Sequence, residues 1–313
     1  MNILSLFVLI PLLMLGALWA ARSLNQVRGV MVVGSTILLA LSVYLTIDYL
    51  ALRQAGATAE MLYTASTVWY APLNICYSVG VDGISVAMLL LSSIIVFTGT
   101  FASWQLKPMT KEYFLWFTLL SAGVYGFFIS TDLFTMFMFY EVALIPMYLL
   151  IGVWGSGQKE YAAMKLTLML MGGSAFLLIG ILGIFYGAGA ETMNILEIAQ
   201  RHIPTEMQRL FFPLIFLGFG VLGALFPFHT WSPDGHASAP TAVSMLHAGV
   251  LMKLGGYGCF RVAMYLMPEG AEIWGNFFLV LTTISVVYGA FSAVVQTDLK
   301  YINAYSSVSH CGL

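Results

Sequence analysis

The sequence predicts an all-α integral membrane protein, a polytopic helical bundle of about nine full transmembrane helices and the start of a tenth. Sixty per cent of the residues are apolar and only 8% are charged, whereas a soluble domain carries roughly a quarter charged residues. The apolar residues form runs of about 20, the length that crosses the hydrocarbon core of a bilayer. The net charge of −2 gives no reason to expect nucleic acid as a partner.

The predicted spans follow one another along the chain with polar loops between them. The first run lacks a basic segment before it and a clear cleavage site after it, so we interpret it as a retained helix and not a signal peptide. The spans are Ile3–Ala21, Gly29–Leu50, Ile84–Trp104, Tyr113–Ser130, Leu133–Trp154, Leu166–Gly187, Leu210–Phe226, Thr241–Met267 and Asn276–Gln296. A tenth begins near Ile302, and the sequence stops inside it at Leu313, so we expect a fragment.

Basic residues divide unequally between the two sides of this bundle. One side receives Arg22, Arg28, Lys107, Lys111, Lys159, Lys165 and Lys300. The other side receives only Arg53, Arg201, Arg209 and Arg261. Cytoplasmic loops carry the excess of Lys and Arg. We therefore expect a multi-pass protein of a bacterial-type inner (cytoplasmic) membrane with its N-terminus outside.

Two ionisable residues lie well inside predicted spans. Glu141 is on Leu133–Trp154, where an ionised carboxylate costs at least about 2.5–3.5 kcal/mol unless a cavity, a cation or a proton compensates. Pro146, five residues on, frees backbone carbonyls that can polarise such a site. Lys253 has no acidic residue within two turns of its own helix, so we expect its partner on another element. Both residues are candidates for a proton relay, and a structural carboxylate is the alternative for Glu141.

Histidines extend the set of relay candidates, because imidazole titrates near neutrality and passes a proton through either ring nitrogen. His247 precedes Lys253 by six residues on the same span, and His310 lies in the truncated tenth span. A hydrogen-bonded packing role is the alternative for each. His229 lies in Pro227–Pro240, where three prolines should break the helix, and non-helical backbone at this depth must line protein or water.

Several other site types are not expected. A metal site using His229, Asp234 and His236 has no further ligand cluster to support it. The cysteines, Cys76, Cys259 and Cys311, are too far apart in sequence to predict an iron–sulfur centre, a zinc site or a disulfide framework. Residues 218–223 match GxGxxG, but they lie within an apolar span, so they indicate helix packing and not nucleotide binding. We expect no catalytic residue, metal, redox or cofactor site in this chain.

Four segments together resemble one family. They are VDGIS at Val81–Ser85, MFYEVALIPMYLLIGVWG at Met138–Gly155, PFHTWSPDGHASAPTAVSMLHAGVLMKLGGYG at Pro227–Gly258, and QTDLKYINAYSSVSHCG at Gln296–Gly312. In these segments the chain resembles the antiporter-like membrane subunits of respiratory complex I, the proton-translocating NADH–quinone oxidoreductase. Within that family it is most similar to the M subunit, the counterpart of mitochondrial chain 4.

The resemblance implies inverted five-helix repeats, each holding a half-channel for protons. Residues 1–110 would form three N-terminal helices, 111–267 the first half-channel repeat, and 268–313 the start of the second. Glu141 matches the family's essential glutamate, Lys253 its connecting lysine and His310 a histidine of the tenth helix. The implied partners are other membrane subunits of the complex, the lipid bilayer and protons. NADH, FMN, iron–sulfur clusters and quinone are expected in partner subunits.

One position departs from the family pattern. The family places a lysine five residues before the proline that matches Pro227, where the lysine pairs with the glutamate. Here that position is Leu222, and His229 or His247 is the candidate replacement. The alternatives to a complex I subunit are a subunit of a multi-subunit cation/proton antiporter or of a membrane-bound hydrogenase. A non-conducting scaffold is the alternative from another class.

Overall fold

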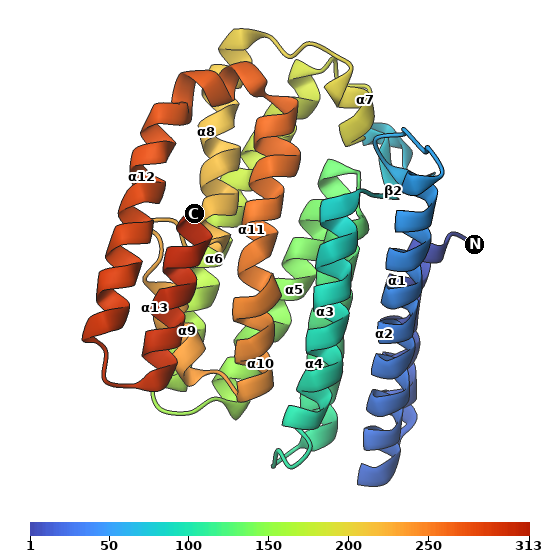
Figure 1. Ribbon diagram of the computed structural model, residues 1–313, viewed down its shortest axis with the longest axis vertical. Coiled ribbons are helices and arrows are strands. Elements are labelled where there is room, and N and C mark those ends of the chain that lie inside the picture. The colour runs from blue at the N-terminus through green and yellow to red at the C-terminus, as the bar shows by residue number, and fades with distance from the viewer.

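The computed structural model describes residues 1–313 as a bundle of long helices with one β-hairpin at the upper end in Figure 1. Eight helices are long and apolar enough to cross a membrane. They are α1 (Leu6–Ala20, preceded by the 3-10 turn η1, Ile3–Ser5), α2 (Leu24–Gln54), α3 (Gly83–Ala102), α4 (Thr110–Ile129), α5 (Leu133–Trp154), α6 (Lys159–Gly187), α8 (Thr205–Leu222) and α12 (Pro268–Val295).

A ninth span is a composite of four helical segments. They run in succession as α10 (Thr241–Leu246), the π-helical η3 (His247–Leu251), α11 (Met252–Gly258) and the π-helical η4 (Cys259–Met264). We call this run the composite helix. With it, all nine predicted spans are confirmed as helices, and α13 (Leu299–Gly312) stands where the tenth was expected. The helical membrane fold class is therefore confirmed.

The helix break predicted around the prolines of residues 227–240 is present, but the span before it is shorter than expected. We predicted a helix to Phe226, whereas α8 ends at Leu222. Ala224 has a φ of 57°, in the left-handed region where an α-helix cannot continue. The eight-residue helix α9 (Trp231–Ser238) then lies within the break, between α8 and the composite helix.

A β-hairpin between α2 and α3 was not predicted. Strands β1 (Leu62–Tyr70) and β2 (Ile75–Val81) pair antiparallel, and the 3-10 turn η2 (Ala71–Leu73) connects them. Asn74 follows η2 with a φ of 49°, a conformation that Asn tolerates better than most residues. The short helix α7 (Ile195–Ala199) lies at the same end of the bundle in Figure 1.

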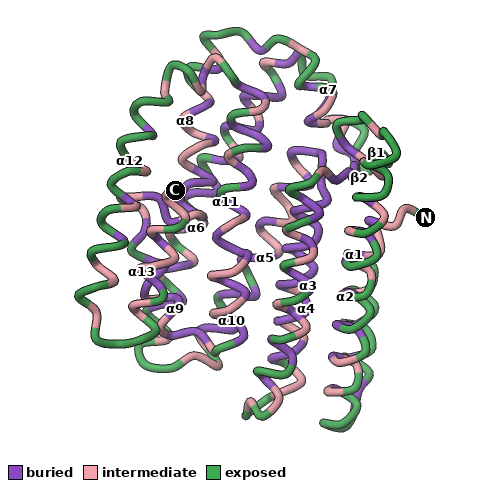
Figure 2. Tube along the Cα trace, viewed as in Figure 1, coloured by how far each residue is buried: buried purple, intermediate pink, exposed green.

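Helix α4 forms the centre of the N-terminal half and is the most deeply buried span. It packs between α1, α3 and α5, and Figure 2 shows it mostly buried. Apart from Trp116, its aromatic residues, Phe117, Tyr125 and Phe127 among them, are fully buried. Burying such a side chain contributes on the order of 1.5–3 kcal/mol. This layer holds α5, which carries Glu141, in a fixed position.

Glycines bring α6 and α8 close together, as the sequence predicted. Added side-chain carbons at Gly180 and Gly183 would collide with Ile215 and Phe211 of α8. Gly218, the first glycine of the rejected GxGxxG motif, faces the carbonyl of Gly173 in the same contact. The motif therefore serves helix packing, because small residues let two backbones approach.

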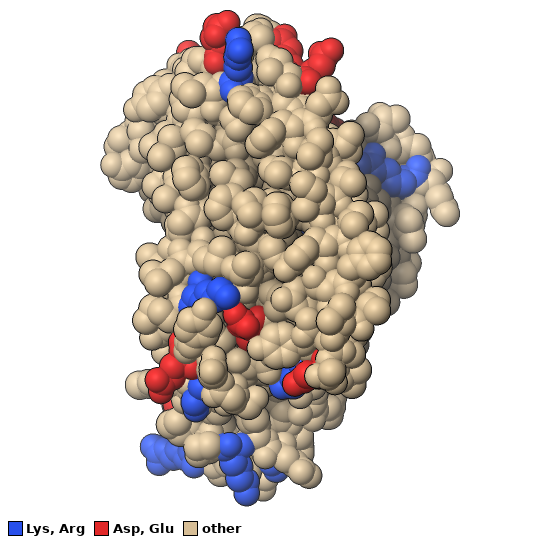
Figure 3. Space-filling view, turned by 90° about the vertical axis from the view of Figure 1, so that its left-hand side faces the viewer, with Lys and Arg blue, Asp and Glu red and all other residues tan.

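Charged side chains separate towards the two ends of the bundle. On the face drawn in Figure 3, the lower end carries mostly Lys and Arg, and the upper end mostly Asp and Glu. The predicted basic loops join the helices at the lower end in Figure 1. We call this lower end the basic end and the end with the hairpin the acidic end.

Candidate functional site

Glu141 lies inside α5 with its carboxyl group towards α6. Its Oε1 atom is buried and has no hydrogen-bond partner. Ser174 of α6 lies beside the carboxyl group, but its hydroxyl donates to the Met171 carbonyl at 2.9 Å. None of the four ion pairs in the structure includes Glu141. A buried acceptor left unpaired costs about 1–3 kcal/mol, so this is a position where a bound proton or water is stabilising.

Three stacked rings occupy the break between α8 and the composite helix. His247 of η3 lies between Trp231 and His236 of α9, with ring centroids 5.2 Å and 4.1 Å away. None of the three residues is more than 1% exposed. Nδ1 of His236 is 3.1 Å from Oγ of Ser244. We call His236 and His247 the histidine pair.

Three ring nitrogens of the histidine pair are buried without a partner: both nitrogens of His247 and Nε2 of His236. Two imidazolium charges would repel strongly at a centroid separation of 4.1 Å inside the protein. A second proton on the pair is therefore strongly disfavoured. His236 was considered from the sequence only as a metal ligand, because the stacking of residues on two different helices has no sequence signature.

Lys253 lies on α11, one segment beyond His247. Its ammonium group donates to the Ala248 carbonyl of η3 at 2.6 Å. We expected an acidic partner from another element, but no carboxylate lies within ion-pair distance. The backbone carbonyl takes that place. Lys253 is close enough to interact electrostatically with both imidazoles of the histidine pair.

Leu222 is 1% exposed and belongs to the apolar core. The residue before it, Val221, accepts a hydrogen bond from the indole of Trp231 at 3.0 Å. Through this bond the last turn of α8 holds Trp231, whose ring stacks on His247. The end of α8 therefore carries no charge at this position, but it positions one face of the histidine pair.

The other two predicted histidines do not join this group. The ring of His229 packs against Phe226 and Tyr288, with centroids 5.5 Å and 4.9 Å away. Its Nδ1 atom is buried and unpaired. His310 is exposed on α13 and forms no side-chain hydrogen bond in the chain. Asp234 does not form a common site with His229 and His236. Its carboxylate pairs instead with the ammonium group of Lys165 at 2.7 Å.

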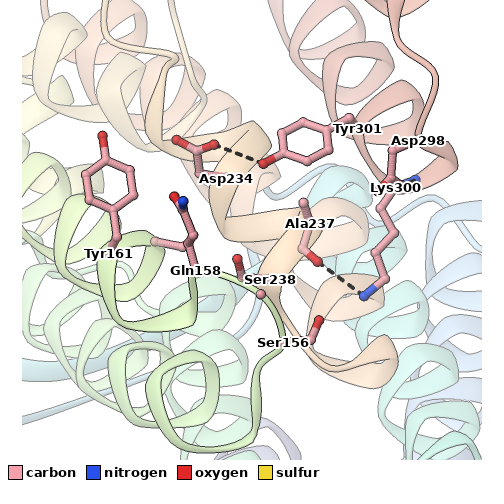
Figure 4. Close-up of a pocket in the computed structure, with 11 residues that line it drawn as sticks. Ser156, Gln158, Tyr161, Asp234, Ala237, Ser238, Asp298, Lys300 and Tyr301 are labelled. Carbon is pink, nitrogen blue, oxygen red and sulfur yellow. Dashed lines mark hydrogen bonds between the residues drawn. The ribbon is translucent and has the colours of Figure 1, made fainter.

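Two ion pairs in the structure were not anticipated from the sequence. At the basic end, Lys165 of α6 pairs with Asp234 of α9, at the edge of a cavity of about 440 Å³ between the start of α6, α9 and α13. Figure 4 shows Asp234 and Tyr301 side by side in the wall of this cavity, joined by a hydrogen bond of 3.3 Å. At the acidic end, Arg261 of the composite helix pairs with Asp82, the residue that caps α3.

The Asp82–Arg261 pair is enclosed by further hydrogen bonds. Oδ1 of Asp82 accepts from the amide and the hydroxyl of Ser85 at 2.9 and 3.0 Å. Nε of Arg261 donates to the hydroxyl of Tyr257 at 3.3 Å, and that hydroxyl is 2.8 Å from Oγ of Ser85. Burial acts to raise the pKa of Asp82, but the bonds from Arg261 and Ser85 outweigh it and hold the pKa below its ordinary value.

The arrangement is suited to moving protons and shows no metal centre. No three His, Cys, Asp or Glu side chains lie close enough together to hold a metal ion. Groups that can bind or release a proton occur instead on successive elements, from Asp234 through the histidine pair to Lys253, with Glu141 on α5. Such groups inside a membrane protein mark proton or ion pathways.

Comparisons with known proteins agree with the sequence motifs. A family model described as NADH:quinone oxidoreductase/Mrp antiporter, TM, matches residues 130–313. The NAD(P)H-quinone oxidoreductase chain 4 3 of Picosynechococcus sp. is 39% identical over 81% of this chain and 46% of its own length. The NADH-quinone oxidoreductase subunit M of Rhodobacter capsulatus is 34% identical over 82% of this chain and 52% of its own length. The chain thus spans about half the length of these curated relatives.

Solved structures share the fold. A chain of respiratory complex I from Thermus thermophilus with bound NADH superposes with a TM-score of 0.87 at 25% identity, covering 99% of this chain and 63% of that chain. A chain of the Mrp complex from Dietzia sp. DQ12-45-1b gives a TM-score of 0.79 at 23% identity, covering 99% and 57%. The predicted antiporter-like architecture is therefore confirmed.

Proposed function

Because this chain belongs to the NADH:quinone oxidoreductase/Mrp antiporter family of transmembrane proteins, we propose that it translocates protons as a membrane subunit of a complex I-type NADH–quinone oxidoreductase. Electron transfer in other subunits would drive the transport. The observation that carries the proposal is the unpaired buried carboxyl oxygen of Glu141 inside a membrane span. An acidic group in that position is stabilised when it takes up a proton, so it can alternate between two states.

The proposed relay consists of Glu141, the histidine pair and Lys253, with His229 and His310 as outlying members. His247 supplies the group that Leu222 lacks, since its ring nitrogens are free and Lys253 lies nearby. In this proposal residues 1–110 form a supporting layer, 111–267 the first half-channel and 268–313 the start of a second. The relay needs water between its members, because no direct hydrogen bond joins them.

The chain would lie in a bacterial-type cytoplasmic membrane with its basic end inside and its N-terminus outside. This orientation is supported by the excess of Lys and Arg at the basic end (Figure 3). Its partners would be other membrane subunits of the complex, and its surroundings the lipid bilayer. NADH, FMN, iron–sulfur clusters and quinone would bind to partner subunits, with no redox site in this chain.

A cation/proton antiporter subunit is the second candidate, and it is favoured by the fold shared with the Mrp complex. Both candidates require Glu141 to take up and release a proton. They therefore share this site and differ only in whether a second cation is transported. A scaffold without conduction is the third, and Leu222 favours it because no charge from α8 reaches Glu141. A scaffold would gain nothing from the unpaired oxygen of Glu141, which argues against it.

We expect Glu141→Gln to abolish proton transport by the complete complex while the complex still assembles, because an amide cannot take up and release a proton in this pH range. The measurement is acidification of sealed vesicles that contain the complex, together with the quinone reduction rate. Glu160→Gln is the matched control, since Glu160 is exposed at the start of α6. Normal acidification by the Glu141→Gln complex would refute the proposal, and a requirement for sodium would favour the antiporter.

A further inference from the structure

The cavity at the basic end is lined by polar groups from three elements that lie far apart in the sequence. Gln158 and Tyr161 come from the start of α6, Asp234 and Ser238 from α9, and Tyr301 from α13. Its volume of about 440 Å³ is large enough for several water molecules, each of which occupies roughly 30 Å³. In Figure 4 the carboxylate of Asp234 faces into this space.

Asp234 is held only by side chains of two other helices. Lys165 of α6 donates to Oδ2 at 2.7 Å, and Tyr301 of α13 donates to Oδ1 at 3.3 Å. The side chain of Asp234 is 27% exposed and that of Lys165 is 23% exposed. The carboxylate accepts no backbone hydrogen bond. The ion pair with Lys165 can therefore open towards the cavity without breaking a backbone hydrogen bond.

Helix α9 connects this carboxylate with the interior. Asp234 lies at the cavity, and two residues further on His236 lies buried against His247. Nε2 of His236 has no partner. The eight-residue helix α9 therefore carries both a carboxylate at the cavity, that of Asp234, and an imidazole of the buried histidine pair, that of His236.

We propose that Asp234, paired with Lys165, is the group that loads protons into the relay from the basic end, where the two residues form a separate acid–amine switch. An excess proton from the medium, carried as hydronium by water in the cavity, passes to an Asp234 oxygen and leaves a neutral water behind, and the ion pair with Lys165 opens. The proton then passes through water to the histidine pair, and the carboxylate pairs with Lys165 again. This inference rests on the proposed function, but it concerns a different pair of residues.

Other charged or titratable groups surround Asp234 and must be held constant in a test. They are Lys165 and Tyr161 on α6, Asp298, Lys300, Tyr301 and Tyr305 on α13. His236 is the titratable group on α9, the helix that carries Asp234. Lys300 is engaged elsewhere, since it donates to the Ala237 and Ala239 carbonyls at 3.2 and 3.3 Å. Lys165 is therefore the cation that competes with a proton for Asp234.

The test uses the complete complex in sealed vesicles with the basic end accessible to the medium. We expect Asp234→Asn to slow proton transport by about tenfold or more, the scale of losing one acid–base group. Asp234→Glu should retain most of the transport and shift its dependence on the pH at the basic end. Glu112→Gln is the control, because Glu112 is an exposed carboxylate in the first turn of α4 at the same end.

A charge exchange distinguishes a proton-loading group from a structural ion pair. Lys165→Asp combined with Asp234→Lys restores an ion pair but moves the carboxylate from α9 to α6. We expect this double variant to assemble and to remain as slow as Asp234→Asn. Transport restored to the wild-type rate would show that only the ion pair matters and would overturn the proposal. Lys165→Met with Asp234→Asn, which leaves no unpaired charge, replaces Asp234→Asn if the single variant fails to assemble.

Glu141→Gln in the same preparation separates the two proposals. If Asp234→Asn transports protons at the wild-type rate while Glu141→Gln does not, the loading role is wrong and the proposed function stands. If both variants transport at the wild-type rate, both proposals are wrong. The expected result is no transport by Glu141→Gln and slow transport by Asp234→Asn, with a changed pH profile only for Asp234→Glu.

Discussion

The ion pairs at the two ends of the bundle have the same chemistry and opposite surroundings. Asp82–Arg261 at the acidic end is held by hydrogen bonds from Ser85 and to Tyr257, and the side chains of Arg261 and Asp82 are 8% and 21% exposed. Lys165–Asp234 at the basic end borders a cavity of about 440 Å³, and each of its two side chains is about a quarter exposed. The first joins α3 to the composite helix, and the second joins α6 to α9.

This difference shows how one type of interaction can serve two purposes. A pair whose remaining lone pairs and protons are all satisfied resists opening, because either charge left alone in the interior is costly. A pair that faces water can open at little cost, since water solvates the separated charges. We therefore expect Asp82–Arg261 to fix the structure and Lys165–Asp234 to change state during transport.

The largest effect should follow from Arg261→Met at the acidic end. Leaving Asp82 without its partner should destabilise the fold by about 3 kcal/mol or more, while the transport rate per assembled complex stays near normal. The measurement compares the amount of assembled complex, its thermal inactivation and its transport rate. Adding Asp82→Asn should recover part of the stability. A stable Arg261→Met complex that no longer transports protons would reverse the roles we assign to the two ends.

A smaller effect on the stability of the fold is expected when the pH is lowered. The pKa of Asp82 in the folded chain is lower than in the unfolded chain. The stability that this carboxylate contributes is therefore fully present above the unfolded value of about 3.9 and is lost as pH falls through the lower folded value. The difference in thermal stability between wild type and Asp82→Asn should stay constant from about pH 7 to about pH 5. A difference that already shrinks over that interval would contradict the enclosed geometry.

The smallest effect should come from Tyr301→Phe at the basic end. It removes one long hydrogen bond to Asp234, of 3.3 Å, which contributes at most about 1 kcal/mol. We expect normal assembly and a transport rate lowered by less than about fivefold. Initial rates of vesicle acidification at several external pH values measure this. A loss as large as that of Asp234→Asn would mean that Tyr301, and not Lys165, governs the carboxylate.

The sequence was sufficient to predict the membrane spans because each needs only a long apolar run, and the lipid imposes the helix. The break at residues 227–240 was also predictable, since Pro227, Pro233 and Pro240 close together remove several backbone donors that a continuous helix needs. The β-hairpin was missed because Leu62–Tyr70 alternates only weakly and is mostly exposed. The sequence could not predict that the composite helix contains π segments, because their hydrogen-bond pattern depends on neighbouring helices.

The site was predicted in part. Glu141, His247 and Lys253 stand out because titratable groups inside apolar runs are rare. In the structure Glu141 and His247 have buried atoms without a hydrogen-bond partner, and Lys253 donates to a backbone carbonyl. Lys165 and Asp234 are 69 residues apart, and the sequence presents them as a loop cation and one acid in a broken segment. Only the packing of α9 against α6 reveals the pair. His236 was considered only as a metal ligand, and its stacking on His247 was not predicted.

The two π segments of the composite helix have a mechanical consequence. A π turn contains one residue more than an α turn. The segments η3 and η4 therefore place an extra backbone residue before and after Lys253. If η3 closed into an α turn, the helix beyond it would rotate by about 100°, the angle of one residue. Lys253, now bonded to the Ala248 carbonyl inside η3, would turn with it. By rotating about its own axis, the composite helix can therefore redirect this ammonium group while the neighbouring helices stay in place.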